Sequence, residues 1–392
     1  MPDHCTDTAT SSTTSSTAAN THTTREKTCA PGTWTGSPAP AVATIPVPMT
    51  DANQLGPKFC RRAASVGMGG AVMEGIEHPC FDGPVQISMF GQLGDAGRDN
   101  PVDACVQNLA MLREEGFRRL WMSQMPYEPD LLTVLAVALR EVADIEVATG
   151  VVPIQNQHPM QMAQRALTVS LVSHGRLILG LGMTHQAVTE GMWGIPWDKP
   201  VRRLNEFLDG LLPLLAGEAA DATGQILTTR GALMIPSAPR PDVYVAALGP
   251  QLLKIAGRRT AGTCTWMTGP KTLAGHVSPT LRQAAADAGR SETAVRVVAA
   301  LPVSVTDDVD GARKQAAEQF KMYGVLPSYR AMLDREGYAG PEDAAIIGDE
   351  ATVRDRLADL SAAGVDEYVA ATFDPSPEGR ARTRAALRAL AS

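Results

Sequence analysis

The stretch HPMQMAQRALTVSLVSHGRLILGLGM, residues 158–183, decides the fold. Its proline at position 159 suits the first turn of a helix, and apolar side chains then recur at helical spacing as far as Leu171. Gly175 can supply the positive φ of a helix C-cap, so we expect the helix to stop there. The apolar run that follows, 176–183, is typical of a buried strand. These residues predict a helix that leads through a short turn into a strand.

The same alternation of short apolar runs and amphipathic stretches extends from residue 85 toward the C-terminus. It is the pattern of repeated βα units around a parallel sheet. We expect an insertion at 217–240, a helical elaboration at 310–336 and a closing helix at 378–390. Periodicity alone leaves open whether the strands close into a barrel or spread as an open sheet. Eight strands are predicted, at residues 85–94, 118–125, 145–154, 176–183, 241–249, 262–269, 294–305 and 366–373.

The first 84 residues differ in composition from the rest. Residues 6–24 are mostly serine and threonine, and the sequence that follows is rich in proline and glycine. Such a segment buries too little apolar surface to offset its ordering entropy, so we expect 1–84 to be a disordered extension. An alternative is that Met68 or Met73 starts the protein. In either case the folded domain is expected at 85–392.

Composition narrows the class of function. The chain is 44% apolar and 20% charged with a net charge of −7, which is ordinary for a globular protein. It has no run of about 20 apolar residues to predict a membrane span, and no Lys/Arg block to predict nucleic-acid binding. The six cysteines show no metal-ligand spacing, so we expect no metal site. We therefore expect a cytoplasmic enzyme that acts on a small molecule.

Three blocks of the sequence resemble the luciferase-like family, which includes flavin monooxygenases and reductases that use the deazaflavin coenzyme F420. They are residues 158–183, AALGPQLLKIAGRRTAG at 246–262 and IIGDEATVRDRLADLSAAGVDEY at 346–368. The resemblance implies a (β/α)8 TIM barrel of the bacterial luciferase-like type over 85–392. It also implies a deazaflavin or FMN cofactor and a homodimer.

In such a barrel the carboxyl ends of the strands form the functional face, and the turns from helix to strand serve stability. Gly175 and Arg176 lie in a turn of the second kind, so we interpret them as structural. Gly180 and Gly182 lie at a strand exit, where the absence of side chains would let a flat cofactor ring approach the backbone. The alternative is that these glycines only give packing clearance.

The end of the third predicted strand is Thr149-Gly150-Val151. Enzymes that this chain resembles often carry a non-proline cis peptide at this point, against the central ring of the cofactor. The resemblance therefore implies a cis bond between Gly150 and Val151, with all three residues close to the cofactor. The alternative is a plain strand end.

Leu248, Gly249 and Pro250 stand between the fifth predicted strand and its helix. A glycine that leads into a helix N-terminus offers backbone N–H groups and a positive dipole end to an anion. We expect the cofactor phosphate there, with help from Thr268 and Gly269 at the end of the sixth strand. Alone, a Gly-Pro pair after a strand is usually only a turn.

The chain departs from its relatives at the reacting centre. Where sugar-phosphate dehydrogenases of the family carry Asp-His, this sequence has Ser123-Gln124-Met125. We expect Ser123 to contact the cofactor and Gln124 to hydrogen-bond at the reaction site, although Gln124 cannot exchange a proton near pH 7. Those enzymes place a glutamate after the Gly-x-Gly pair, whereas here His185 follows and is the candidate acid or base. The alternative is a solvated histidine. His158 is expected to cap a helix.

These observations favour a coenzyme F420-dependent oxidoreductase that transfers hydride between the deazaflavin and a small organic substrate. One alternative is an FMN-dependent monooxygenase, because composition cannot separate the two cofactors. Another is a barrel that binds the cofactor without catalysis, since the Asp-His pair and the glutamate are missing.

Overall fold

The computed structural model describes residues 85–93, 100–235 and 237–391. The expected disordered extension, 1–84, lies outside these residues, as does the segment 94–99 that follows the first strand. Ten of the strands form one sheet and two more form a separate hairpin.

Eight strands of the large sheet close into a parallel barrel, which settles the choice that periodicity left open. Each strand pairs in parallel with the next, and the last pairs with the first. The other two strands are short: β4 (Val152–Pro153) pairs with the fourth barrel strand, and β11 (Ile346–Gly348) pairs with the end of the seventh. In barrel order the eight are β1 (Gln86–Gly91), β2 (Arg119–Met122), β3 (Glu146–Thr149), β5 (Leu177–Gly182), β8 (Val243–Ala246), β9 (Gly262–Trp266), β10 (Arg296–Val305) and β12 (Glu367–Thr372).

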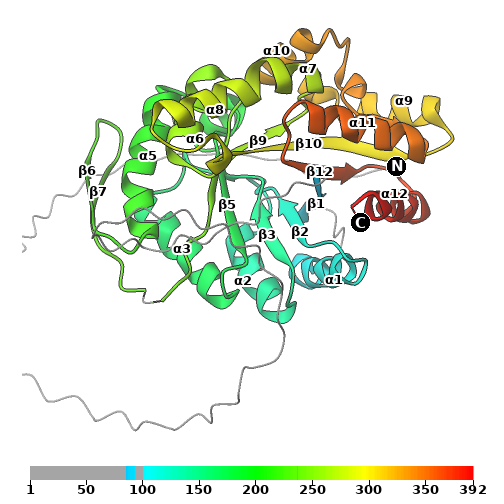
Figure 1. The fold of residues 1–392 in the computed structure, drawn as a ribbon. Helices are drawn as coiled ribbons and strands as arrows, with labels where there is room; N and C mark the ends of the chain where they lie inside the picture. The colour runs from blue at the N-terminus through cyan, green and yellow to red at the C-terminus, as the bar shows by residue number, and fades with distance from the viewer. Residues whose placement is uncertain (1–84, 94–99, 236, 392) are drawn as a thin grey trace, which may run out of the picture. The chain divides into compact units, whose positions relative to one another are not determined.

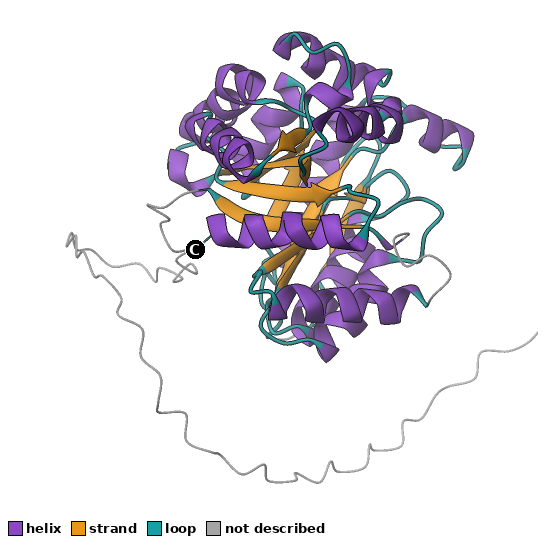
Figure 2. Cartoon of the chain, turned by 90° about the vertical axis from the view of Figure 1, so that its right-hand side faces the viewer, coloured by secondary structure: helices purple, strands orange, loops and turns teal. Residues whose placement is uncertain are grey.

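Helices cover the outside of the barrel, so that the strands are enclosed (Figures 1 and 2). No helix of the described segments has both the length and the apolar character needed to cross a membrane. The helices are α1 (Pro101–Glu114), α2 (Leu131–Glu141), α3 (Pro159–Val172), α4 (Gln186–Gly191), α5 (Pro200–Leu215), α6 (Pro250–Arg259), α7 (Pro270–Thr272), α8 (Ser278–Asp287), α9 (Val309–Gln319), α10 (Pro327–Glu336), α11 (Glu350–Ala362) and α12 (Pro377–Leu390).

The unit α3–β5 forms as the sequence predicts. His158 caps α3, because its Nδ1 accepts a hydrogen bond from the Met160 N–H at 3.2 Å. Gly175 has a φ of 84°, which confirms its role in ending the helix. The Arg176 guanidinium donates to the carbonyl oxygens of Leu139, Val142 and Ile145 at 2.6–3.0 Å, so this residue is structural, as expected.

The predicted insertion at 217–240 contains an antiparallel hairpin, β6 (Ala220–Thr223) and β7 (Thr228–Gly231). Glu206 of α5 holds its turn, because the carboxylate accepts from the N–H groups of Gln225, Ile226 and Leu227 at 2.8–3.0 Å. Desolvation opposes the charge on Glu206, but these donors outweigh it and lower the pKa of the carboxyl.

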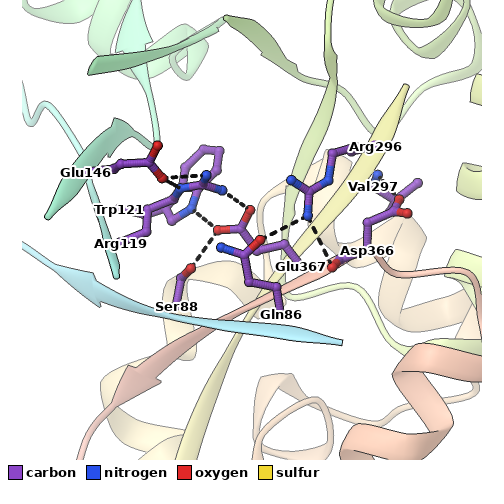
Figure 3. Close-up of polar contacts among 9 residues, drawn as sticks. All are labelled: Gln86, Ser88, Arg119, Trp121, Glu146, Arg296, Val297, Asp366 and Glu367. Atoms are coloured by element: carbon purple, nitrogen blue, oxygen red, sulfur yellow. Dashed lines mark hydrogen bonds and ion pairs between the residues drawn. The ribbon is translucent and has the colours of Figure 1, made fainter. Parts of the chain in front are cut away.

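The amino-terminal half of the barrel interior holds a buried network of charged side chains (Figure 3). Glu367, fully buried, accepts from Ser88 Oγ and Trp121 Nε1, both at 2.7 Å, and pairs with Arg119. Arg119 also donates to Glu146 at 2.7 and 3.0 Å. Glu367, Arg119 and Glu146 each begin a strand, so this network lies at the end of the barrel that serves stability.

Candidate active site

The carboxyl ends of β3, β5 and β8 lie side by side and bring most of the predicted site residues together. Leu181 of β5 pairs with Val245 of β8, so Gly182 lies beside Ala246, three residues before Gly249. The glycine pair and the Gly249 turn therefore share one rim of the barrel, as the sequence predicted.

Thr149 ties the end of β3 to β5. Its Oγ1 donates to the Gly180 carbonyl at 2.7 Å and accepts from the Gly180 N–H at 2.8 Å, and the residue is fully buried. The next peptide bond, Gly150–Val151, is cis, which confirms the expectation drawn from the resemblance. The Gly150 N–H donates to the Met122 carbonyl at 2.7 Å, so this segment is fixed to β2 as well.

Gly180 and Gly182 lack side chains because neighbouring parts of the chain occupy the space beside them, and not, as first expected, to admit a cofactor ring. A Cβ on Gly180 would collide with the Thr149 carbonyl oxygen, and a Cβ on Gly182 would collide with the Val151 side chain. The space beside these glycines is therefore filled by the chain itself. The structure supports packing clearance, and contact between a cofactor ring and these two residues stays a prediction.

The loop after β2 contains two predicted site residues, Ser123 and Gln124, which differ in whether their side chains already have hydrogen-bond partners. Ser123 Oγ is buried and has no hydrogen-bond partner, which leaves it available to a ligand at this rim. Gln124 is different, because its amide already has partners within its own loop, and its role at the reaction site stays a prediction. Its amide nitrogen donates to the carbonyls of Met125 and Pro129, and its oxygen accepts from the Leu131 N–H at 2.6 Å. Gln124 organises the loop that leads into α2.

His185 lies at the rim after β5, beside a residue that the sequence analysis missed. Its ring is 5.9 Å from that of Tyr329 in α10, and Tyr329 is 5.0 Å from Tyr323. Burial lowers the pKa of His185 and raises the pKa of Tyr329, so at neutral pH the histidine is neutral and the phenol keeps its proton. Both tyrosines belong to the 310–336 elaboration, whose sequence gave no sign that it reaches the barrel mouth.

Two further aromatic rings, those of Trp266 and Phe90, extend this cluster of tyrosines at the barrel mouth. Trp266, at the end of β9, is 5.7 Å from Tyr323 and 5.7 Å from Phe90 of β1. Below them the Trp121 ring lies against Gly150, where a Cβ would be 3.3 Å from Trp121 Cε3. Rings from β1, β2, β9 and α10 therefore surround the rim on several sides.

Gly249 begins α6 without a side-chain cap. Its φ is −80°, it is exposed, and an added Cβ would meet nothing within 4 Å. The adjacent Leu248 carbonyl accepts a hydrogen bond from His276 Nε2 at 2.8 Å, which fixes the turn. Pro250 takes the first helical position, where its missing N–H costs nothing. This helix end offers its free N–H groups to an anion, as predicted.

Thr268 and Gly269 have partners within the chain, and their predicted help in binding the phosphate stays a prediction. Thr268 is fully buried and donates to the Trp266 carbonyl at 3.2 Å. Gly269 packs against Glu336, because a Cβ on this glycine would be 2.7 Å from the Glu336 carboxyl carbon. The helix that starts here is capped by Glu336, which accepts from the N–H groups of Lys271 and Thr272. A carboxylate of the chain itself therefore binds the N–H groups of this second helix start.

The profile of the luciferase-like monooxygenase family matches residues 86–367. The chain belongs to the luciferase-like monooxygenase family. This luciferase-like protein is 28% identical over 238 residues to a 5,10-methylenetetrahydromethanopterin reductase of Methanolobus tindarius, covering 61% of this chain and 72% of the relative.

Solved structures of similar fold include proteins with either type of cofactor. The coenzyme F420-dependent tetrahydromethanopterin reductase of Methanopyrus kandleri superimposes with a TM-score of 0.66 at 20% identity, covering 78% of this chain and 98% of that one. The oxygenating constituent of 3,6-diketocamphane monooxygenase from Pseudomonas putida, solved with FMN, gives 0.63 at 15% identity over 78% and 96%. At these identities the likeness shows the fold.

The residues of this luciferase-like protein fit a phosphate-bearing tricyclic cofactor. The uncapped N-terminus of α6 at Gly249 suits the phosphate, and the unpartnered Ser123 Oγ suits a polar edge of the ring. A separate hollow of about 1030 Å³ between α5 and the β6–β7 hairpin is lined by charged side chains such as Arg202 and Asp221. It is away from the strand ends and plays no part in this fit.

Proposed function

We propose that this protein is a coenzyme F420-dependent oxidoreductase, which transfers hydride between the deazaflavin and a small organic substrate. The observation that carries the proposal is the open helix N-terminus at Gly249, which lies on the same rim as Thr149–Val151 and the free Ser123 Oγ. The names of the reductases to which the chain is similar support the deazaflavin.

The bound cofactor supplies the redox chemistry, because a deazaflavin accepts and donates hydride. The protein holds and orients it. N–H groups of the first turn of α6 would bind the phosphate beside Gly249, and Ser123 Oγ would offer a hydrogen bond to the ring. Thr149 fixes the end of β3 to β5, which keeps Val151 in one position at the rim.

Two side chains at the mouth can act on a polar atom of the substrate. Tyr329 keeps its phenol proton because burial raises its pKa, so its Oη can donate a hydrogen bond. The ring of His185 lies next to it and is neutral because burial lowers its pKa, so one ring nitrogen can accept a proton. Together they take over the acid–base work that the Asp-His pair and the glutamate perform in relatives.

The substrate that fits this rim is apolar. Large apolar side chains are exposed in the loop after β2, where Tyr127 is 72% exposed, and between α9 and α10, where Met322 is 67% and Val325 75% exposed. The aromatic rings of Trp266 and Tyr323 stand beside them. A hydrophobic carbonyl, enone or imine would be held by these groups while its heteroatom receives the proton.

The proposal is tested by titrating the purified protein with coenzyme F420 and with FMN, followed by fluorescence. We expect a deazaflavin Kd in the micromolar range and FMN binding weaker by about tenfold or more. Reduced F420 should then be reoxidised anaerobically by apolar enones, imines or quinones. His185→Asn should slow this step by about 100-fold with an unchanged Kd.

Other outcomes would point elsewhere. Tighter binding of FMN with oxygen uptake would favour an FMN-dependent monooxygenase. Binding of F420 without turnover for any acceptor would favour a carrier, and binding of neither cofactor would contradict an oxidoreductase of this kind. The homodimer implied by the resemblance stays a prediction, which light scattering on the purified protein would test.

A further inference from the structure

A carboxylate of the chain occupies one of two neighbouring helix N-termini at the rim. Glu336, at the end of α10, is only 7% exposed. Its Oε2 accepts from the Lys271 N–H at 3.3 Å and its Oε1 from the Thr272 N–H, at the start of a helical stretch that runs without a break to Asp287. The Glu336 carboxylate packs directly against Gly269, where an added Cβ would be 2.7 Å from the carboxyl carbon. The carboxylate is therefore built into this position.

The second helix N-terminus, at Gly249, lies beside the first and is open. Strands β8 and β9 are neighbours, with Ala246 opposite Cys264, so the turns that follow them are adjacent. A hydrogen bond of 2.8 Å from His276 Nε2 to the Leu248 carbonyl joins the two turns. The rim thus has two adjacent anion positions, of which Glu336 fills one.

The Glu336 carboxylate is held by main-chain N–H groups and not by a charged side chain. In the described part of the chain no lysine, arginine or histidine forms an ion pair with its carboxylate, and Lys271 Nζ donates instead to the Glu336 main-chain oxygen at 3.1 Å. Charges in a partly buried site interact more strongly than in water. An anion at Gly249 will therefore be repelled in proportion to its own charge.

We propose that Glu336 selects the cofactor by the charge of its phosphate. The phosphodiester of the deazaflavin coenzyme carries one negative charge, whereas the phosphomonoester of FMN carries close to two at pH 7. Beside Glu336 the Gly249 position favours the singly charged group. This inference rests on the proposed function and goes beyond it, because it names the residue that discriminates between the two cofactors.

The wild-type protein allows a first test that needs no variant. Binding of FMN is compared with riboflavin, which lacks the phosphate, and binding of F420 with its phosphate-free riboside, all by fluorescence at pH 7.5. We expect the monoester to improve affinity by less than about threefold and the diester chain by about tenfold or more. A larger gain from the monoester than from the diester would overturn the proposal.

The second test replaces the charge with a neutral group of the same shape. Glu336→Gln should tighten FMN by about tenfold and F420 by about threefold, and should leave riboflavin unchanged. Glu292→Gln, in the exposed turn before β10, removes the same charge at the opposite end of the barrel and should change none of the three. Equal changes for FMN and riboflavin in Glu336→Gln would show that charge is not the cause.

The two proposals fail in different ways. If wild type binds F420 and turns it over but Glu336→Gln leaves the ratio of FMN to riboflavin affinity unchanged, only the role of Glu336 is wrong. If wild type binds flavins but not F420, while Glu336→Gln still raises FMN affinity over riboflavin, charge selection stands and the deazaflavin assignment is wrong.

Discussion

At the scale of single residues, the rim distinguishes glycines that the fold needs from a glycine that it does not. Gly180 has no room for a side chain, because the Thr149 carbonyl oxygen occupies that position. Gly249 has open space and a negative φ, so the fold does not require a glycine there. An open glycine at a helix start is what a ligand that approaches the backbone needs.

This difference predicts that the same substitution affects stability strongly at Gly180 and hardly at all at Gly249. Gly180→Ala should lower the free energy of unfolding by about 1–3 kcal/mol or prevent folding, because the methyl group overpacks the end of β5. Gly249→Ala should change it by less than about 0.5 kcal/mol. Urea unfolding of both variants checks this, and equal stability of the two would contradict the packing described here.

His185 predicts how stability depends on pH. Burial lowers its pKa below the ordinary value of 6.5. The unfolded chain therefore binds a proton at His185 more readily than the folded chain, and stability falls as the pH drops below about 6.5. Wild type should lose more stability between pH 7.5 and 5 than His185→Asn does. Equal losses in urea unfolding at the two pH values would show that the histidine is solvated.

At the scale of elements, the sequence predicts the strands and helices well because each has its own apolar period and its own cap. The unit α3–β5, with His158, Pro159 and Gly175, is an example. The third strand is less simple, since 145–154 divides into β3 and β4 at the cis bond. Local patterns do not reveal such a division, and only the family resemblance indicated it.

Contacts between distant elements could not be predicted. Glu336 accepts a hydrogen bond from the N–H of Lys271, which is 65 residues away in the sequence, and no local sequence pattern predicts this contact. The contact of Gly269 with Glu336 could not be foreseen for this reason. Likewise, Tyr329 has no sequence signal that places it beside His185. The case of Gln124 is different: its type suits a reaction site, but its amide makes hydrogen bonds within its own loop.

The β6–β7 hairpin depends on one side chain of α5. Glu206→Ala removes the acceptor for three N–H groups at the hairpin turn. We expect the amides of Gln225, Ile226 and Leu227 to exchange about 10- to 100-fold faster, since a lost hydrogen bond to a charged group is worth about 1.5–3 kcal/mol. Glu218→Ala, at an exposed position nearby, is the control. Unchanged exchange in Glu206→Ala would mean that the turn is stable by itself.

At the scale of the whole molecule, the two ends of the barrel have separate roles. The charged network of Arg119, Glu146 and Glu367 lies at the amino end (Figure 3). The candidate site lies at the carboxyl end. Trp121 links them, because its Nε1 donates to Glu367 and its ring lies against Gly150. The buried polar network at the amino end is therefore connected through Trp121 to the site at the carboxyl end.

Breaking the network should therefore destabilise the whole barrel. Glu367→Gln leaves the buried Arg119 with one carboxylate partner fewer, so we expect a loss of about 3–5 kcal/mol in the free energy of unfolding. Glu114→Gln breaks a surface pair with Arg113 of 3.7 Å and should cost less than about 1 kcal/mol. Similar losses in denaturant unfolding would contradict a structural role for the buried network.

The central claim is that the helix start at Gly249 holds the phosphate of a deazaflavin, and the affinity of Gly249→Asp for F420 tests it most directly. The open space admits the aspartate, whose carboxylate is a good helix cap and should leave the protein as stable as wild type. That carboxylate would take the place of the phosphate, so we predict that F420 binds about 100-fold more weakly than to wild type or Gly249→Ala. A folded Gly249→Asp protein that binds F420 as tightly as wild type would contradict the claim.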